Sequence, residues 1–543
     1  MASEGCESPA TLRRRAAHSR WGMLRGVIYT FREYCHHSSL HGLKYLTDER
    51  RHPVDKLYWL VAFISGLSLS YFFIVAIWSK WEENPIIVSL DTTAAIINDI
   101  PFPAVTICNM NKMKRSAVEK LTLRFRSGER NAHNKQLLRS MKDVIRWRSK
   151  TASGSFFSNG SDAAIDALVT QDTTLAPDNL SDEDVTGQNM ADFMKQVTPS
   201  CRDMLKYCRW DSVVENCESL FQEVTSDDGL CCAFNTLPEA LIRRPLSGET
   251  DNYTEHWTPE IGYVRENDTF PKRGAAPGVS AGLTLLLDVQ MEEYFLPRSG
   301  SVGFKVLLHS PTDVPAVKEF GFAVSPGAES FISVRPSQVY STRQIRSLNQ
   351  SRRKCYFEEE RPLAFFRIYS VSSCVAECLA NATQRKCRCR EHFMPAANDS
   401  VRVCGFLDTI NCVKDIGDVI SGSSNRKLCD CQPACTELSY SHELSSTRFP
   451  TSNDLGTNTL DNLRNAIQHN ESFESFVKNH ALVHVFLRDY KVMRYKRARM
   501  YDILDFTANL GGLLSLCLGF SFLSAAEIIY FACMRCGFLS RRR

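Results

Sequence analysis

Two long apolar runs divide the chain. The first lies between Lys56 and Lys80 and carries no charge, and the second extends from Phe506 to Ala526 and resumes after Glu527. A helix that crosses a bilayer needs about 20 apolar residues. The pattern therefore predicts transmembrane helices over residues 57–79 and 504–534, a large loop over 80–503, and tails at 1–56 and 535–543.

Basic residues gather on the flank of each run that faces away from the loop. They are Arg13, Arg14, Arg15, Arg20, Arg25, Arg50, Arg51 and Lys56 before the first run, and Arg535 and Arg541 to Arg543 after the second. Because Lys and Arg favour the cytosolic side, both termini are predicted to be cytosolic in a multi-pass protein of the plasma membrane. The first run follows a long basic tail and ends in Trp78 and Trp81, which is typical of an anchor and not of a cleaved signal peptide.

Glycosylation signals and cysteines place the loop outside the cell. Asn-x-Ser/Thr signals begin at Asn159, Asn179, Asn252, Asn267, Asn349, Asn381, Asn398 and Asn470, all between the two runs. Of the 21 cysteines, five lie outside the loop (Cys6, Cys35, Cys517, Cys533, Cys536) and sixteen lie within it. An even number in an oxidising compartment predicts eight disulfides.

Shorter patterns inside the loop predict an α+β ectodomain. Alternating or β-branched runs predict strands in NPIIVSLDTT, PFPAVTICN, GLTLLLDVQ, SVGFKVLLHS and FGFAV. Helical spacing of apolar residues predicts helices within 112–147, and the Ser-, Gly- and Asp-rich stretch 153–189 predicts a glycosylated surface loop. The strand-rich part from 282 to 323 is expected to form a β-sheet core.

The densest cysteine pattern lies near the end of the loop. Its members are Cys355, Cys374, Cys378, Cys387, Cys389, Cys404, Cys412, Cys429, Cys431 and Cys435. Two Cys-x-Cys pairs within it are also compatible with zinc, but Asn381 and Asn398 put the ladder in an oxidising compartment, which favours disulfides and no structural metal. Spacing alone leaves the connectivity open.

Catalytic motifs are missing from the sequence. It contains no nucleophile elbow, Walker loop, dinucleotide fingerprint or zincin helix, so we expect no enzyme activity and no organic cofactor. The net charge of +4 in 543 residues does not point to a nucleic-acid partner. An ectoenzyme is therefore disfavoured.

An ordered set of motifs resembles one channel family over nearly the whole chain. The motifs are His41-Gly42, PFPAVTICNMN, CRDMLKYC, GLCCAFN, GLTLLLDVQMEEY, the cysteine ladder, ANLGG and LGFS. Together they resemble the degenerin, epithelial sodium channel and acid-sensing channel family, with the arthropod pickpocket branch the most similar. The resemblance implies a trimer, homomeric or built with related subunits, in the membrane lipid, and an ectodomain of palm, finger, knuckle, β-ball and thumb.

The resemblance also implies a disulfide pairing. The implied bridges are Cys108–Cys231, Cys201–Cys208, Cys355–Cys435, Cys374–Cys431, Cys378–Cys429, Cys387–Cys412 and Cys389–Cys404, which leaves Cys217–Cys232. The ladder residues 355–435 would form the thumb. Closely spaced bridges would stiffen a helical rod so that movement reaches the membrane, or would simply stabilise the ectodomain; both interpretations stay open.

Residues of the second run are implied to line a sodium path. Gly519, Phe520 and Ser521 match the Gly-x-Ser selectivity filter, with Phe520 larger than the residue in many relatives, and Ser515 matches the position associated with amiloride. Carbonyl and hydroxyl rings replace part of a cation's hydration shell. Glu527 is expected in the cation path, because an ionisable group at membrane depth must face water or a partner; the alternative is a glutamate at the cytosolic interface.

Gating is implied for a second group of residues. His41-Gly42 matches the motif before the first crossing, and Ala508 matches a small residue whose enlargement keeps relatives open. Gly511 and Gly512 interrupt an apolar helix, either for gating or for close helix packing. A surface role for His41 and a lipid-facing role for Ala508 are the alternatives.

The predicted function is a subunit of an amiloride-sensitive, sodium-selective, non-voltage-gated channel, gated through its ectodomain, in sensory or epithelial cells. One alternative is a two-crossing glycosylated scavenger or lipid receptor, which would need no glycine-broken second crossing. Another is an ATP-gated trimeric channel, which would need a lysine-rich phosphate site that the loop lacks. Cys35, Cys533 and Cys536 are candidates for palmitoylation, with reduced thiols as the alternative.

Overall fold

The structure, a computed structural model, describes residues 29, 31–83, 85–93, 95–126, 193–244, 257–263, 270–295, 301–396, 401–404, 408–421, 429–450, 472–500 and 502–531. The chain forms two compact units. One comprises residues 1–87 with 498–543, and the other comprises residues 88–497. The second unit contains most of the predicted loop, and the first contains both predicted crossings together with the two ends of that loop, 80–87 and 498–503.

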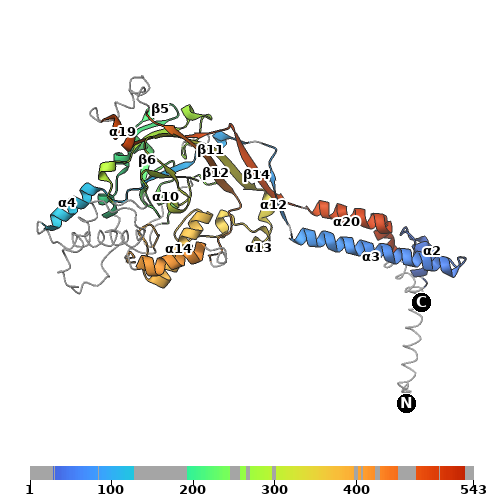
Figure 1. Ribbon diagram of the computed structural model, residues 1–543. Helices are drawn as coiled ribbons and strands as arrows, with labels where there is room; N and C mark the ends of the chain where they lie inside the picture. The colour runs from blue at the N-terminus through green and yellow to red at the C-terminus, as the bar shows by residue number, and fades with distance from the viewer. Residues whose placement is uncertain are drawn as a thin grey trace, which may run out of the picture. The chain divides into compact units, whose positions relative to one another are not determined.

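The larger unit is built on a mixed sheet of nine strands (Figure 1). Its main path runs β1 (Ile86–Leu90), β14 (Lys491–Arg499), β11 (Ala328–Ser341), β13 (His480–Leu487), β8 (Leu283–Asp288), β4 (Leu205–Trp210) and β5 (Val213–Glu215). β12 (Glu437–Arg448) pairs with β11 along its length, and β2 (Ala95–Ile96) pairs with β14. Strands that are distant in sequence are therefore neighbours, since β13 pairs in parallel with β11 and antiparallel with β8.

A second sheet of five strands completes the core of this unit. Its order is β10 (Phe322–Val324), β9 (Phe304–His309), β3 (Ala104–Asn109), β7 (Gly229–Phe234) and β6 (Phe221–Ser226). Trp210 of the large sheet packs between Phe102 and Phe234, with ring centroids 4.7 and 5.0 Å apart. The predicted strands are confirmed, and the alternating runs from 282 to 323 are β8, β9 and β10.

Helices and short turns make up the rest of the described part of this unit. The helices are α4 (Arg115–Arg126), α8 (Cys201–Met204), α9 (Cys217–Leu220), α10 (Glu239–Ile242), α11 (Val317–Phe320), α12 (Arg343–Arg346), α13 (Gln350–Arg353), α14 (Val371–Cys387), α16 (Lys414–Ser421) and α19 (Phe473–Asn479). Short turns are η1 (Ile97–Asp99), η3 (Val279–Ala281), η4 (Met291–Glu293), η5 (Glu358–Glu360) and η6 (Thr409–Val413). α4 confirms the start of the helical prediction over 112–147; residues 127–147 and the loop 153–189 lie outside the described residues.

The cysteine ladder clamps α14. Cys374 and Cys378 lie one turn apart on this helix and bridge Cys431 and Cys429, and Cys387 at its last residue bridges Cys412. Cys389–Cys404 and Cys355–Cys435 complete the ladder as the resemblance implied. Ser370 caps the helix by accepting from the Ser373 N–H. Five predicted ladder bridges are thus confirmed, and zinc at these cysteines is excluded because all ten are bridged.

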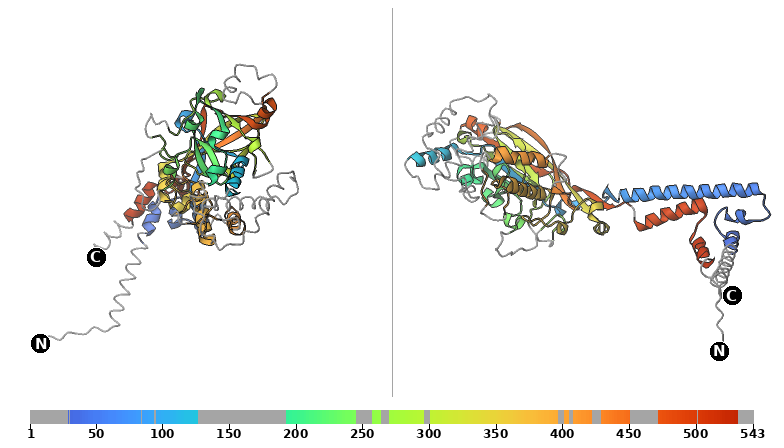
Figure 2. Two further views of the ribbon diagram at one scale, coloured as in Figure 1. Left: turned by 90° about the vertical axis from the view of Figure 1, so that its left-hand side faces the viewer. Right: turned by 90° about the horizontal axis from the view of Figure 1, so that it is seen from below.

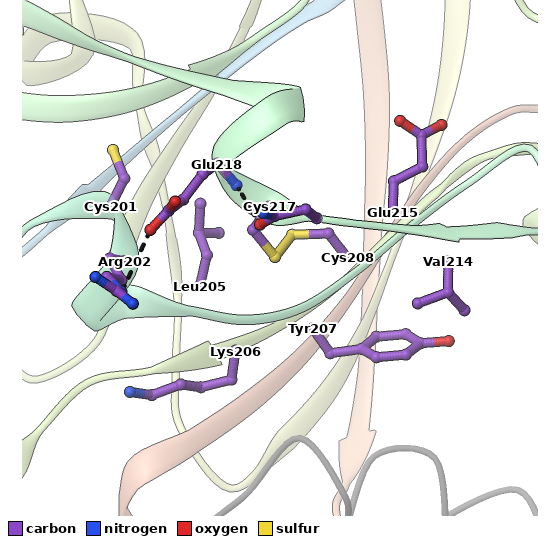
Figure 3. A pocket seen from close by; sticks show the side chains of 11 residues that line it. Cys201, Arg202, Leu205, Lys206, Tyr207, Cys208, Val214, Glu215, Cys217 and Glu218 are labelled. Atoms are coloured by element: carbon purple, nitrogen blue, oxygen red, sulfur yellow. Dashed lines mark hydrogen bonds and ion pairs between the residues drawn. A yellow bond between two sulfur atoms is a disulfide. The ribbon is translucent and has the colours of Figure 1, made fainter.

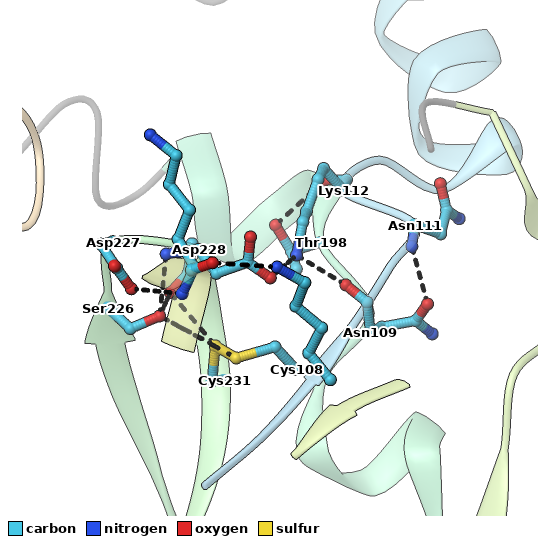
Figure 4. A network of polar contacts seen from close by, with 12 residues as sticks. Cys108, Asn109, Asn111, Lys112, Thr198, Ser226, Asp227, Asp228 and Cys231 are labelled. Atoms are coloured by element: carbon cyan, nitrogen blue, oxygen red, sulfur yellow. Dashed lines mark hydrogen bonds and ion pairs between the residues drawn. A yellow bond between two sulfur atoms is a disulfide. The ribbon is translucent and has the colours of Figure 1, made fainter. Parts of the chain in front are cut away.

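Cys108–Cys231 is also confirmed, and it anchors the tip of the β6–β7 hairpin (Figure 4). Next to it, the Lys112 ammonium lies 2.6 Å from the almost fully buried Asp228 carboxylate and donates to the Asn109 carbonyl at 2.7 Å. A buried carboxylate needs such a partner, because its desolvation is otherwise unfavourable. The hairpin is therefore tied to the segment that follows β3 by a covalent bond and an ion pair.

Two predicted bridges are wrong. The structure has Cys201–Cys232 and Cys208–Cys217 in place of Cys201–Cys208 and Cys217–Cys232. Figure 3 shows the Cys208–Cys217 bridge. β4 runs extended from Leu205, at about 3.3 Å per residue, and so carries Cys208 away from Cys201 at the start of α8. The β4–β5 hairpin then returns the chain and places Cys217 with its Cα 5.3 Å from that of Cys208.

Two of the eight glycosylation signals fall on described residues. Asn349 is exposed and precedes α13, whereas Asn381 lies inside α14 with the Thr383 of its signal fully buried. The other six, Asn159, Asn179, Asn252, Asn267, Asn398 and Asn470, lie outside the described residues.

The smaller unit contains the two apolar segments. α3 (Pro53–Glu83) is long and apolar enough to cross a membrane, and α20 (Ile503–Leu518) with α21 (Phe522–Ile529) qualifies as a second span only if the bent pair is counted as one. α3 and α20 lie side by side, as Figures 1 and 2 both show. Phe506 of α20 packs against both Trp78 and Trp81 of α3, at 6.0 and 5.9 Å between ring centroids. α2 (Leu43–Thr47) precedes α3.

Candidate functional site: a broken helix and the amino-terminal segment beneath it

The second apolar segment breaks at the predicted filter. α20 ends at Leu518 and α21 begins at Phe522, with a bend of 75° between them (Figure 2, right). Gly519 has the left-handed φ of 70°, and its N–H donates to the Ser515 carbonyl at 2.8 Å, as in a glycine-terminated helix. A side chain is disfavoured in this conformation, which explains glycine here.

Ser521 starts the second half of the segment. Its side chain accepts from the Ser524 N–H, and the Ser524 hydroxyl accepts in return from the Ser521 N–H at 3.1 Å. This reciprocal capping satisfies N–H groups that a helix start leaves free. The break at residues 519–521 is thus built by local sequence on both of its sides, and Gly519, Phe520 and Ser521 form the connection.

His41 lies against this break. Its backbone N–H donates to the Leu518 carbonyl at 2.9 Å, and so satisfies one of the carbonyls that the end of α20 leaves without an intrahelical donor. Gly42 follows with φ of 87° and starts α2, where Tyr45 stacks on Trp59 of α3 at 4.5 Å. The His-Gly dipeptide therefore turns the amino-terminal segment back beneath the second apolar segment.

Glu527 and Ser524 of α21 meet the same amino-terminal segment. The Ser39 N–H and hydroxyl each lie 3.1 Å from the Glu527 Oε2, and the Ser39 Oγ lies 2.7 Å from the Ser524 Oγ. Ser524 is fully buried. Sequence reasoning selected Glu527 but missed Ser39 and Ser524; a serine two residues before His41 is the only local signal, and it does not name its partners.

Comparisons with known proteins identify the family. The family described as "Amiloride-sensitive sodium channel" matches residues 34–531. The chain is 32% identical to Pickpocket protein 28 of Drosophila melanogaster over 529 residues, which cover 95% of this chain and 80% of that protein. This chain belongs to the amiloride-sensitive sodium channel family. Its members are ion channels and not enzymes, which decides against the receptor, ectoenzyme and ATP-gated alternatives.

More distant relatives agree with this family. Sodium channel protein Nach of Drosophila melanogaster is 24% identical over 508 residues, covering 92% of this chain and 86% of that protein. Acid-sensing ion channel 1A of Danio rerio is 24% identical over 516 residues, covering 91% and 86%. Because the family match begins at residue 34 and ends at 531, it includes the His-Gly segment, the break and Glu527.

The remaining residues that the resemblance implied for the pore and its gate share one face of α20. Ala508, Gly511, Gly512 and Ser515 are all exposed and recur at helical spacing on the side away from α3. A Cβ added to Gly511 or Gly512 would meet nothing within 4 Å, whereas one added to Gly66 of α3 would lie 3.1 Å from the Cys517 carbonyl. Close packing of the two helices within the chain therefore uses Gly66 and does not use Gly511 or Gly512.

The ectodomain unit contains an open cleft of about 650 Å³ over β4, β5 and α9 (Figure 3). Its charged lining includes both signs, and Arg202 pairs with Glu218 at 3.3 Å. Its cysteines, Cys201, Cys208 and Cys217, are all bridged. The lining offers no nucleophile with an adjacent base, so this cleft gives no support to an enzymatic reading.

Proposed function

We propose that this chain is a subunit of a sodium-selective, amiloride-sensitive channel that is gated through its ectodomain and not by voltage, in the plasma membrane of sensory or epithelial cells. In the proposed topology α3 is one crossing, α20 with α21 is the other, both tails are cytosolic and residues 80–503 face outward. The subunit assembles as a trimer, alone or with related subunits.

One observation carries the proposal: the second apolar segment is broken at Gly519, and the break is held by His41. Non-helical backbone at membrane depth is tolerated only where it is buried in protein or lines water. Three copies of Gly519, Phe520 and Ser521 around an axis would form a ring of carbonyls and hydroxyls, which is a chemistry that binds small cations. Na⁺ is the proposed permeant ion, and Glu527 would add negative charge below the ring.

The exposed face of Ala508, Gly511, Gly512 and Ser515 supports the same arrangement. Small side chains allow three helices to approach one another around a path, and Ser515 lies one turn before Gly519, where amiloride is proposed to block. Coupling to the ectodomain is supported by α14, which three bridges hold to the rest of the ladder. A stiff helix passes on movement that a flexible one would absorb.

The test is whole-cell current from cells that express the full chain, alone and with related subunits. We expect an inward current that is carried by Na⁺, blocked by amiloride and independent of voltage steps. Ser521→Cys should change the permeability ratio of Na⁺ to K⁺, whereas Phe522→Cys, at the adjacent residue with a 97% exposed side chain, should not. Surface expression that falls while the permeability ratio stays unchanged would make Ser521 a packing residue and contradict the proposal.

A further inference from the structure

Ser39 connects two parts of the chain that are 488 residues apart. It lies two residues before His41, and its backbone and side chain both reach α21. The Ser39 N–H and hydroxyl converge on the same oxygen of Glu527, Oε2, at 3.1 Å each, and neither uses Oε1. Two donors on one oxygen of an ionised carboxylate hold that oxygen in place more firmly than one, because each is a charge-assisted hydrogen bond.

A chain of hydrogen bonds links the filter break to Glu527 through two hydroxyls. The Ser521 N–H can only donate, and an ionised carboxylate can only accept. With the Ser39 hydroxyl donating to the Glu527 Oε2 (3.1 Å), the Ser524 hydroxyl donates to the Ser39 Oγ (2.7 Å), and the Ser521 N–H donates to the Ser524 Oγ (3.1 Å). Without the Ser39 hydroxyl, the fully buried Ser524 hydroxyl loses its shorter acceptor and keeps only the Ser521 Oγ at 3.3 Å.

We infer that Ser39 is a positioning residue of the cation path: it holds the Glu527 carboxylate in place and links it to the backbone of the filter break. The inference rests on the proposed function. Ser39 acts through Glu527 and Ser524 and does not itself have to contact the ion. The amino-terminal segment therefore contributes to ion choice through one serine, in addition to the His41 contact with Leu518.

Conduction tests the role. Ser39→Ala keeps the N–H donor and removes the hydroxyl, and we expect the Na⁺ to K⁺ permeability ratio to change by about tenfold, which corresponds to about 1.4 kcal/mol, near the lower end of the range for a hydrogen bond to a charged group. Ser39→Thr retains a hydroxyl and should restore most of the wild-type ratio. Ser38→Ala is the matched control, because the Ser38 hydroxyl accepts from the Leu40 N–H at 3.2 Å and should leave the ratio unchanged.

Coupling separates a positioning role from a general effect on the pore. In a Glu527→Gln background, Ser39→Ala should change the ratio little further, because residues that act through one another are non-additive. Equal effects of Ser39→Ala with and without Glu527→Gln would overturn the inference. So would a permeability ratio that is unchanged in Ser39→Ala.

The contact itself has a test that needs no current. In the full chain with Cys6, Cys35, Cys517, Cys533 and Cys536 replaced by serine, Ser39→Cys and Ser524→Cys are introduced together and the membranes are oxidised. Labelling with a polyethylene glycol maleimide then counts free thiols on a gel. Loss of both labels, within one chain or as a covalent dimer, supports the contact, and the pair Ser38→Cys with Ser524→Cys should keep both labels. Equal protection of the two pairs, or of neither, overturns it.

The two readouts keep the two proposals apart. A chain that carries no cation current with any related subunit overturns the proposed function, while the cross-link still decides whether Ser39 meets α21. A cross-link that forms without any effect of Ser39→Ala on the permeability ratio overturns the positioning role and leaves the proposed channel function standing.

Discussion

A Cβ atom on Gly519 would lie 2.8 Å from both Cδ2 and Nε2 of the His41 ring. This distance is shorter than carbon atoms tolerate, so the ring occupies the space that only a glycine leaves open. The same histidine donates its backbone N–H to the carbonyl of the preceding residue, Leu518. One residue of the amino-terminal segment therefore fits the helix break by shape and by hydrogen bonding.

Gly519→Ala should strongly reduce cation current at equal surface expression. The left-handed backbone disfavours a Cβ by about 1–2 kcal/mol, and the His41 ring must also move. Gly417→Ala in α16 is the control, because its added Cβ also meets nothing within 4 Å and lies outside the proposed pore, so it should change the current little. Combining Gly519→Ala with His41→Ala should recover part of the current; no recovery would attribute the defect to backbone strain alone.

Ala508→Phe should raise the current in the absence of any stimulus. Ala508 lies on the exposed face of α20 that we propose to meet its copies, and a phenyl ring there would force neighbouring helices apart. Unstimulated, amiloride-blocked current is compared with that of wild type at equal surface expression. Leu516→Phe, where an 84% exposed side chain is already large, should leave it unchanged. Equal currents from Ala508→Phe and wild type would place Ala508 against lipid.

The corrected disulfides are tested by mapping thiols. Cys208→Ser should free Cys217 for alkylation and leave Cys201 bridged to Cys232. Peptide mass spectrometry of the alkylated full chain identifies the free cysteine directly. Cys201→Ser should in turn free Cys232. Alkylation of Cys201 in the Cys208→Ser protein would restore the pairing that the family resemblance implied.

His484 belongs to a ladder of polar side chains across four adjacent strands. Arg209 on β4 donates to the Thr284 hydroxyl on β8 at 3.1 Å, Thr284 lies 3.0 Å from the His484 Nδ1 on β13, and the His484 Nε2 lies 2.9 Å from Glu329 on β11. Neutral His484 fits this order, since Nδ1 accepts and Nε2–H donates. A proton on Nδ1 would leave the Thr284 hydroxyl facing two donors, the Arg209 guanidinium and the His484 Nδ1–H.

The ladder should make the ectodomain less stable in acid. Burial lowers the pKa of His484 below its usual 6.5, against the opposing effect of Glu329. The folded state then binds the proton less tightly than the unfolded state, so stability is full above pH 6.5 and falls as the pH drops below it. His484→Gln should reduce this loss in the thermal midpoint of the full chain, measured in detergent at about pH 7.5 and about pH 5. An unchanged acid loss would contradict the assignment.

Asp313 should make the ectodomain more stable in acid, which is the opposite of the effect expected for His484. Burial raises the pKa of its carboxyl to about 6, with a smaller contribution from Glu437, while the hydroxyls of Ser370 and Ser372 at the start of α14 lower it. A raised carboxyl pKa means that the folded state binds the proton more tightly, so this contribution to stability grows as the pH falls through about 6 and is absent at higher pH. Asp313→Asn should remove that gain and so make the full chain lose more stability in acid than wild type does. A smaller loss of stability in acid for Asp313→Asn than for wild type would contradict this prediction.

Local pattern was sufficient for the elements of this protein. The uncharged run between Lys56 and Lys80 is long enough to cross a bilayer as a helix, and α3 includes all of it. A helix suits a bilayer because its backbone hydrogen bonds are made within the helix itself. The strands of the ectodomain follow from alternation and β-branching, which act between neighbours in sequence. Gly519 was singled out by the family resemblance and not by the pattern alone, because glycine is favoured but not required at a left-handed helix end, as Arg388 after α14 shows with φ of 54°.

The tertiary structure decided which residues each element contacts. The residues from Cys201 to Cys232 allow several pairings, and only the β4–β5 hairpin, which returns Cys217 to Cys208, selects one. Glu527 is recognisable in the sequence as a costly charge, but its partner Ser39 is not, because a hydrogen bond between residues 488 positions apart leaves no periodic trace in either segment. Periodicity records the burial of a face, whereas the identity of the atoms across that face is fixed only when the chain has folded.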